Sequence, residues 1–413
     1  MAVSLSALHD RLVQLTIPIL DSLQKTNYAP PEGTTVSTKT ILCSLIQTTP
    51  ENQAAVVDRD LVLSSIKNST LALALLISSQ TSTHESLCWI PKHISLAAAS
   101  AFYTISEEYY AVFGKSLVVE LLPEVAPFLK ERIKESSIDK KNNIDEVTAA
   151  SARVPVVHAI LAAYQLRWFV TQIECRHLGK LLNLIVPCAL TALDHWSLEV
   201  KGQGMISFIR IAKNVNPTEL AFYEDVILDA CCQNIASTDE IWHLVVEMSV
   251  LLVTNTQKNN CRSSWFERML NEMLSHLERQ PRNKDRRIAW LNYIEPLFSA
   301  VGLVLLAHFT RIFPLFFKWM HADDDETVIL VLQQFCTVIK LTWIRNTPYI
   351  ERLVDELTKL YKEAALRKAR EEIRTHILQI LILLQQCKGA QFETAWDKYK
   401  DDPNLTRSRF LFE

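Results

Sequence analysis

Apolar side chains recur every three to four positions along most of the chain. Two consecutive sets illustrate the pattern: Phe309, Ile312, Phe313, Phe316 and Met320, then Val328, Val331, Leu332, Phe335, Val338 and Ile339. Such spacing places each set on one face of an α-helix. No convincing run alternates apolar and polar residues as a half-buried strand would. The pattern therefore predicts helices from one end of the chain to the other.

Several of these helices follow a common arrangement, in which a first helix with an internal proline leads through a polar turn to a second apolar helix. Pro187 precedes the turn at Asp194, and Pro314 precedes the acidic turn at 323–326. Helical hairpins of about 40–47 residues are typical of HEAT repeats, which bury their apolar faces by stacking. We expect an all-α fold, an α-solenoid of about eight irregular HEAT/ARM-like hairpins. Two joined four-helix bundles are the structural alternative.

Polar segments rich in turn-forming residues predict the loops between these helices. The expected organisation is a single solenoid over 1–413, with N-terminal repeats in 1–177, C-terminal repeats in 178–400 and a tail in 401–413. The four predicted loops are Asn27–Thr38, Glu135–Glu146, Thr254–Arg262 and Arg279–Arg287.

Composition narrows the classes of function. The 413 residues include only 7 glycines, against roughly 7% in average proteins, which disfavours sheets and phosphate-binding loops. A net charge of −3 disfavours a general nucleic-acid binder, which needs a basic surplus. The nine cysteines form no C-x-x-C pair, so free thiols in a reducing compartment are expected. The first residues do not resemble a signal peptide, and uninterrupted apolar runs are shorter than a membrane span. We expect a soluble, intracellular protein with no nucleic-acid or membrane partner.

The acidic stretch 323–326, directly after His321, is the most conspicuous candidate for chemistry. Between two helices, Asp323 can serve as the N-cap of the second helix, and Glu326 can complete a capping box. A metal site would need further ligands from elsewhere in the chain, and no glycine permits a calcium-binding loop. The expected role is a turn and cap, with a metal site and an acidic partner-binding surface as the alternatives.

Other titratable pairs lack the companions that catalysis or metal binding requires. Cys175 and His177 are two residues apart and point to different sides of a helix, unlike a nucleophile and its base. The pairs His243–Glu247 and Glu272–His276 are four residues apart, yet no third ligand is indicated. The sequence Gly202–Gly204 indicates close helix packing. We therefore predict no catalytic residue, no cofactor and no metal.

Two basic segments and three tryptophans have functional as well as structural interpretations. The segment Arg279–Arg287 reads as a solvated loop, or else as a nuclear-import signal or a contact for an acidic partner. Lys362–Arg374 suits an exposed helix with ion pairs one turn apart. Trp290, Trp319 and Trp343 are expected in the core, and the alternative is that they anchor a partner on a concave surface.

The segment from Arg286 to Arg345 resembles the Tti-two family, the second Tel-two-interacting protein. The resemblance rests on the order of "EPLFSAVGL", "HFTRIFPLF", "DDDET" and "LTWIR". It is firm over about 60 residues and weak back to Leu178. The family pattern has proline where this chain has Ile344.

The resemblance implies a helical-repeat subunit of a co-chaperone complex with Tel-two and Tti-one. That complex cooperates with the Hsp-ninety machinery and supports the assembly of phosphatidylinositol-3-kinase-related kinases. Implied partners are therefore Tti-one-like and Tel-two-like proteins and, indirectly, client kinases. Its implied location is cytoplasmic, with nuclear entry left open. The residues of the matched segment that mark a partner site are His308, Arg311, Trp319, Trp343 and Arg345.

Two alternatives to this adaptor role stay open at the level of sequence. A different HEAT-type scaffold, such as a nuclear-transport adaptor, would explain the basic segment near Arg282. An enzyme would require a pocket in which titratable groups converge. If the adaptor role holds, loss of the matched segment from Arg286 onward should abolish partner binding.

Overall fold

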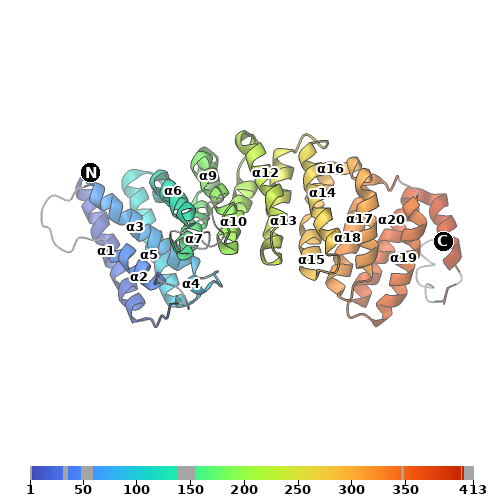
Figure 1. The fold of residues 1–413 in the computed structure, drawn as a ribbon, viewed down its shortest axis with the longest axis horizontal. Coiled ribbons are helices and arrows are strands. Elements are labelled where there is room, and N and C mark those ends of the chain that lie inside the picture. The colour runs from blue at the N-terminus through green and yellow to red at the C-terminus, as the bar shows by residue number, and fades with distance from the viewer. Residues whose placement is uncertain are drawn as a thin grey trace, which may run out of the picture. The chain divides into compact units, whose positions relative to one another are not determined.

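The computed structural model describes residues 2–30, 36–47, 59–136, 154–345, 348–400 and 402–403. Within these ranges, the secondary structure is helical and contains no β-strand. Within the described ranges, many successive helices pack as antiparallel pairs (Figure 1). The predicted all-α solenoid of helical hairpins is confirmed. Residue contacts divide the chain into two compact units, Met1–Tyr223 and Glu224–Glu413.

Unit 1 consists of two layers of helices around α7. Helices α3, α7 and α10 pack in succession, while α6 and α9 pack on each other and on the α7–α10 layer. Most residues of α7 between Val157 and Val170 are buried. This helix is apolar on nearly all sides because other helices pack around it. Its elements are α1 (Ala2–Lys25), α2 (Thr38–Gln47), α3 (Arg59–Ser78), α4 (Glu85–Cys88), α5 (Lys92–Phe113), α6 (Leu117–Glu135), α7 (Val156–Gln172), α8 (Cys175–Leu178), η1 (Gly179–Leu181), α9 (Leu182–Leu193), α10 (Leu198–Asn214), α11 (Pro217–Leu220) and η2 (Ala221–Tyr223).

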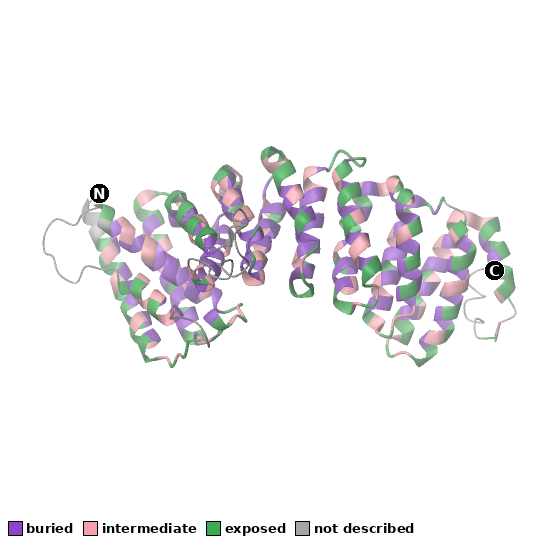
Figure 2. Ribbon diagram, in the orientation of Figure 1, coloured by how far each residue is buried: buried purple, intermediate pink, exposed green. Residues whose placement is uncertain are grey.

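Unit 2 repeats this two-layer arrangement. One layer runs through α13, α15, α18 and α20, and the other through α12, α14, α17 and α19 (Figure 1). Buried residues concentrate on the helix faces between the layers (Figure 2). Its elements are α12 (Glu224–Asn234), α13 (Asp239–Thr256), α14 (Ser264–Arg279), α15 (Lys284–Tyr293), α16 (Glu295–Val301), η3 (Gly302–His308), α17 (Phe309–Met320), α18 (Asp325–Thr342), α19 (Pro348–Glu363), η4 (Ala364–Leu366), α20 (Arg370–Trp396) and η5 (Asp397–Tyr399).

The prolines and close-packed glycines lie where the sequence pattern indicated. Pro187 is internal to α9 and Pro314 to α17, and each of these helices is the first member of a hairpin. A Cβ added at Gly204 would lie 2.9 Å from the Cβ of Ala192, so α10 and α9 approach too closely for a larger residue. The prediction of close helix packing at this glycine is confirmed.

Some predicted loop boundaries are wrong, because hydrophobic pattern and charge alone do not locate helix ends. Helix α13 continues to Thr256, inside the predicted loop Thr254–Arg262, and α15 begins at Lys284, inside Arg279–Arg287. Conversely, the predicted helix at Lys362–Arg374 is interrupted between α19 and α20 by η4. The predicted loop Glu135–Glu146 lies outside the described residues beyond Ser136, as does the predicted tail apart from Asp402 and Pro403.

One segment, Glu295–Met320, is long and apolar enough to cross a membrane by length and composition, although its uninterrupted apolar runs are short. In the structure it is not one straight helix, since Gly302 with φ 56° separates α16 from η3 and α17. Its aromatic residues form part of the core of unit 2. Phe313 and Phe316 are fully buried and pack edge-on against Phe335 of α18.

Candidate interaction surface

Residues of the acidic stretch between α17 and α18 cap a helix and form ion pairs with neighbouring repeats. Asp324, and not Asp323 as predicted, is the N-cap of α18, and its Oδ1 accepts a hydrogen bond of 2.9 Å from the backbone N–H of Thr327. Asp324 also faces Arg287 of α15, whose guanidinium donates to its carboxylate, and this contact favours Asp324 over Asp323 as the cap. Glu326 lies 4.0 Å from Lys284 and caps nothing.

Equivalent contacts recur along unit 2, and we call them the arginine–aspartate ladder: Arg286–Asp239, Arg287–Asp324 and Arg367–Asp325. Arg286 bonds Asp239 at 2.5 Å and also donates to the carbonyl of Ser237. Arg367 bonds Asp325 at 3.0 Å and the carbonyl of Ala322 at 2.7 Å. Each pair joins neighbouring helices of the α13–α15–α18–α20 layer: α13 to α15, α15 to α18, and α18 to the turn before α20.

The ladder keeps its carboxylates ionised. A hydrogen bond from Arg286 holds the pKa of Asp239 below its usual value, and the backbone N–H of Ala369 does the same for the pKa of Asp325. Partial burial opposes ionisation of Asp324, yet hydrogen bonds from Thr327 and Arg287 still lower its pKa. These aspartates are therefore structural partners of arginines and poorly suited to act as proton donors.

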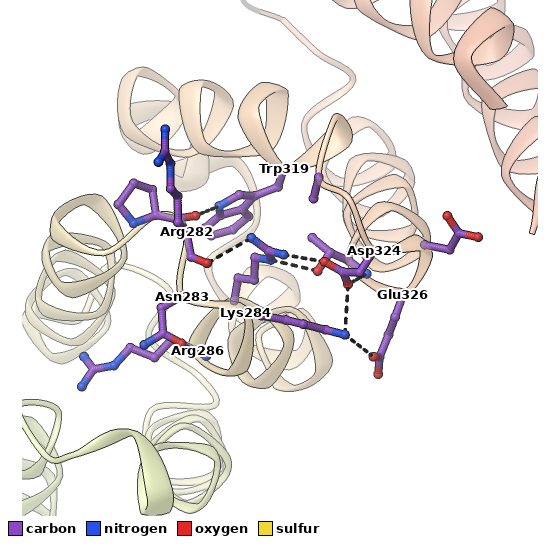
Figure 3. A network of polar contacts seen from close by, with 12 residues as sticks. Arg282, Asn283, Lys284, Arg286, Trp319, Asp324 and Glu326 are labelled. Carbon is purple, nitrogen blue, oxygen red and sulfur yellow. Dashed lines mark hydrogen bonds and ion pairs between the residues drawn. The ribbon is translucent and has the colours of Figure 1, made fainter. Parts of the chain in front are cut away.

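The basic segment Arg279–Arg287 is accordingly not a solvated loop. Arg286 is buried and stacks over the ring of Trp242 at 5.2 Å, while only 12% of the Arg287 side chain is exposed. Lys284 faces the acidic turn as well (Figure 3). Arg286 and Arg287 are therefore engaged within the fold, whereas Arg279, Arg282 and Lys284 are exposed.

Among the residues of the other predicted titratable pairs, His243 lines a pocket of about 540 Å³ between α13 and α15, which it shares with Asp239, Glu240 and Asp285. The Sγ of Cys175 lies 3.1 Å from Oδ1 of Asn214, and burial raises the pKa of the Cys188, Cys231 and Cys232 thiols. Among the described residues, no group of three or more His, Cys, Asp or Glu side chains has the geometry to hold a metal ion. His276 lies beside Arg286, with 3.3 Å between its Nδ1 and the guanidinium.

The five residues marked by the resemblance divide into a buried set and an exposed set. Trp319 is 1% exposed, and its indole N–H donates to the carbonyl of Pro281. His308 is buried, and burial lowers its pKa. Trp343 is 61% exposed and Arg345 is exposed. Direct partner contact through Trp319 or His308 would require the fold to open, so these two are structural residues.

Arg311 is also committed to the fold. Its guanidinium makes two hydrogen bonds with Glu278, of 2.8 and 2.7 Å, and further bonds with Asn271 and Ser275. All three partners lie on α14, so Arg311 fastens α17 to that helix. The hydrogen bonds that Arg311 donates to Glu278 raise the pKa of Arg311 above its usual value.

Trp343 is held outward by an unusual backbone. It ends α18 with φ 51°, and the next residue, Ile344, has φ 36°; both lie in the left-handed region that favours glycine. Ile344 is fully buried, and its N–H donates to Oγ1 of Thr342, which in turn donates to the carbonyl of Val338. We call Trp343, Ile344 and Arg345 the Trp343 corner.

Burial of Ile344 stabilises the strained backbone of the corner. A non-glycine residue in the left-handed region costs about 1–3 kcal/mol and persists only where its surroundings enforce it. Burial of Ile344 supplies about 1.5–3 kcal/mol, which offsets that cost. The result is a large aromatic side chain presented to solvent on a fixed backbone. Neither Trp343 nor Arg345 has a side-chain hydrogen bond or ion pair with another described residue.

The architecture places this chain among the helical-repeat proteins. No family model matches it. It is 55% identical over 414 residues to an Arabidopsis thaliana protein described as uncharacterized protein At2g39910, with 97% of this chain and 94% of that protein covered. The chain belongs to the family of that plant protein.

Solved structures with similar helical arrangements include an engineered protein and the karyopherin Kap121p. The engineered protein is 12% identical, with a TM-score of 0.44, covering 98% of this chain and 97% of its own. Kap121p bound to the SUMO protease Ulp1p is 12% identical with a TM-score of 0.35, and Kap121p alone is 11% identical with the same score. The chain covers 43% of Kap121p.

Proposed function

We propose that this protein is a non-enzymatic adaptor that binds folded protein partners through the Trp343 corner. The observation that carries the proposal is the exposed Trp343 on a strained, anchored backbone at the end of α18. Tryptophan and arginine are the residue types most enriched at the energetic centres of protein interfaces. A fixed backbone lowers the entropy lost on binding, because the anchor is already in place.

The partners we propose are Tti-one-like and Tel-two-like helical-repeat proteins, in a co-chaperone complex that assists phosphatidylinositol-3-kinase-related kinases. Support comes from the resemblance of Arg286–Arg345 to the Tti-two family, since the corner lies at the end of that segment. Ile344 departs from the family pattern, and its φ of 36° could not be adopted by proline, whose ring fixes φ near −65°. The corner would therefore be shaped differently in this chain.

A nuclear-transport adaptor receives less support from the structure. The feature that favoured it, the basic segment Arg279–Arg287, is engaged in the arginine–aspartate ladder. Cytoplasmic location, with or without nuclear entry, accordingly remains a proposal that follows from the co-chaperone role.

The test is affinity purification of the tagged full-length protein from its own cells, followed by quantitative mass spectrometry. Three versions are compared: the wild type, Trp343→Gly, and the control Leu366→Ala, which removes another apolar side chain that is 96% exposed. Glycine relieves the left-handed strain at position 343, so stability should stay within about 1 kcal/mol of the wild type.

We expect near-equal amounts of Tti-one and Tel-two homologues with the wild type and with Leu366→Ala. Recovery with Trp343→Gly should fall at least tenfold. Absence of both homologues from the wild-type sample would overturn the proposed partners. Equal recovery with Trp343→Gly would overturn the role of the corner.

A further inference from the structure

Unit 1 contains a pocket that the adaptor role described above does not use. It holds about 250 Å³ and opens between α2, α3, α6 and α7. Its floor consists of Leu71, Leu75, Leu161 and Ala162, all of which are buried. Sites for drug-sized molecules usually occupy about 300–1,000 Å³, so this pocket is matched better by one or two side chains of a larger partner.

The mouth of the pocket carries an exposed aromatic ring and a free cation. Phe128 lines it and is 44% exposed, although large aromatic residues are usually buried. The guanidinium of Arg132 lies over this ring, 5.3 Å from its centroid. Arg132 makes no ion pair with any described carboxylate, whereas most other arginines of the described chain do. A cation at an apolar mouth complements an occupant that combines an apolar group with a negative charge.

Two further polar groups line the same pocket. Gln165 is 5% exposed; its Nε2 donates to the carbonyl of Leu71 at 3.0 Å, and no described residue donates to its Oε1. His158 lies beside Arg132, and burial together with that cation lowers the pKa of His158. Glu135 favours the protonated form only weakly. An incoming carboxylate would therefore find Arg132 as its cation and His158 as a neutral hydrogen-bonding neighbour.

We propose that this pocket docks a helical segment of a partner protein, with one large apolar side chain in the pocket and an Asp or Glu one turn away against Arg132. The pocket size argues for a side chain, and the unpaired guanidinium argues for an acidic neighbour. On a helix, residues three or four apart share a face, so one segment can place both groups at once. This proposal concerns unit 1 and is independent of the Trp343 corner.

The test is selection of a phage-displayed library of helical 16-residue peptides against the full-length protein. Selected peptides are synthesised, and their affinities are measured by fluorescence anisotropy. We expect enrichment of Leu, Phe or Met with an Asp or Glu three or four residues away. The affinity should fall at least tenfold for Arg132→Glu and for Ala162→Leu, which narrows the floor. Arg176→Glu makes the same charge change on an exposed arginine of unit 1 and should leave affinity unchanged.

A reciprocal exchange separates direct pairing from loss of fold. Peptides with Lys in place of the acidic residue should bind Arg132→Glu better than they bind the wild type, which an unfolded variant could not do. If Arg132→Glu fails to fold, as judged by circular dichroism, Arg132→Ala takes its place. The prediction is then only that peptide affinity falls at least tenfold. Absence of any enriched peptide, or enriched peptides that ignore Arg132 and Ala162, would overturn the proposal.

Discussion

His195 is a residue whose neutral form is built into the fold. It lies in the turn between α9 and α10 and is fully buried. Its Nδ1 accepts a 3.0 Å hydrogen bond from the N–H of Ser197, so its Nε2 carries the proton and donates to Oγ of Ser136 at 3.1 Å. Burial lowers the pKa of His195 from 6.5 to about 4.

This histidine makes stability depend on pH. The folded pKa lies below the unfolded one, so its contribution is complete above pH 6.5 and is lost as the pH falls toward 4. The contribution amounts to about 3 kcal/mol, since a tenfold change in proton affinity corresponds to about 1.4 kcal/mol. We expect the free energy of unfolding, measured in urea between pH 7 and 4, to fall less steeply in His195→Gln than in the wild type. A wild-type slope in His195→Gln would contradict the assignment.

Trp290 and Trp319 offer a matched pair in the core of unit 2. Both side chains are buried, and the centroids of their rings lie 6.0 Å apart. Of the two indole N–H groups, only that of Trp319 has an acceptor, the carbonyl of Pro281. The indole N–H of Trp290 is buried without a partner. Substitution by phenylalanine therefore removes a hydrogen bond at one position and an unsatisfied group at the other.

We expect Trp319→Phe to destabilise the protein by about 1 kcal/mol more than Trp290→Phe, the net value of one hydrogen bond. The measurement is the midpoint and slope of urea unfolding for both variants at pH 7. A larger loss in Trp290→Phe would show that shape, and not hydrogen bonding, distinguishes the two sites.

At the scale of elements, the arginine–aspartate ladder explains how successive hairpins are held in register. Arg287 connects the first turn of α15 to the N-cap of α18, where Asp324 also bonds Thr327. Removal of one member of a partly buried charged pair leaves the other without its counterion. Exposed pairs such as that of Lys284 contribute much less.

Arg287→Ala should accordingly lower the free energy of unfolding by about 1–3 kcal/mol, and Lys284→Ala by less than about 0.5 kcal/mol. The double variant Arg287→Ala with Asp324→Asn should cost less than the two single changes together, because the pair interacts directly. Strict additivity in urea unfolding would contradict a direct interaction.

The sequence predicted helices well and their long-range contacts poorly. Asp323 and Asp324 are equally good caps by composition, and the choice depends on Arg287, which is 37 residues away. For the same reason, the sequence did not indicate that Arg286 and Arg287 of the basic segment belong to the ladder. The number of basic residues in a segment does not show which of them have acidic partners elsewhere in the chain. Trp319 is three residues after Phe316 and Trp343 four residues after Ile339, so periodicity assigns both to an apolar face and could not have separated them. The left-handed backbone at Trp343 is the difference, and the pattern does not show it.

The pocket of unit 1 was not visible in the sequence for a related reason. It joins four helices over residues 41 to 165, and no local pattern brings these together. Periodicity could not have singled out Phe128 either. It is seven residues after Leu121 and three after Val125, so the pattern places it on the apolar face of α6 with the buried leucines, yet it is 44% exposed.

At the scale of the whole molecule, two-layer stacks of helical hairpins present long faces suited to binding other proteins. Several partly buried charged groups of unit 2 join neighbouring helices, as the ladder and Arg311 illustrate. The exposed Trp343 corner is a feature of unit 2 that packing does not explain, and it carries the proposed recognition of a protein partner.

Reconstitution of the proposed complex tests partner recognition through the Trp343 corner most directly. The full-length protein is co-expressed with the Tti-one and Tel-two homologues of the same organism, and the assembly is analysed by size-exclusion chromatography with light scattering. The account predicts one peak that contains all three chains in equal amounts, and its loss for Trp343→Gly. Separate elution of the wild-type chain from both homologues would contradict it.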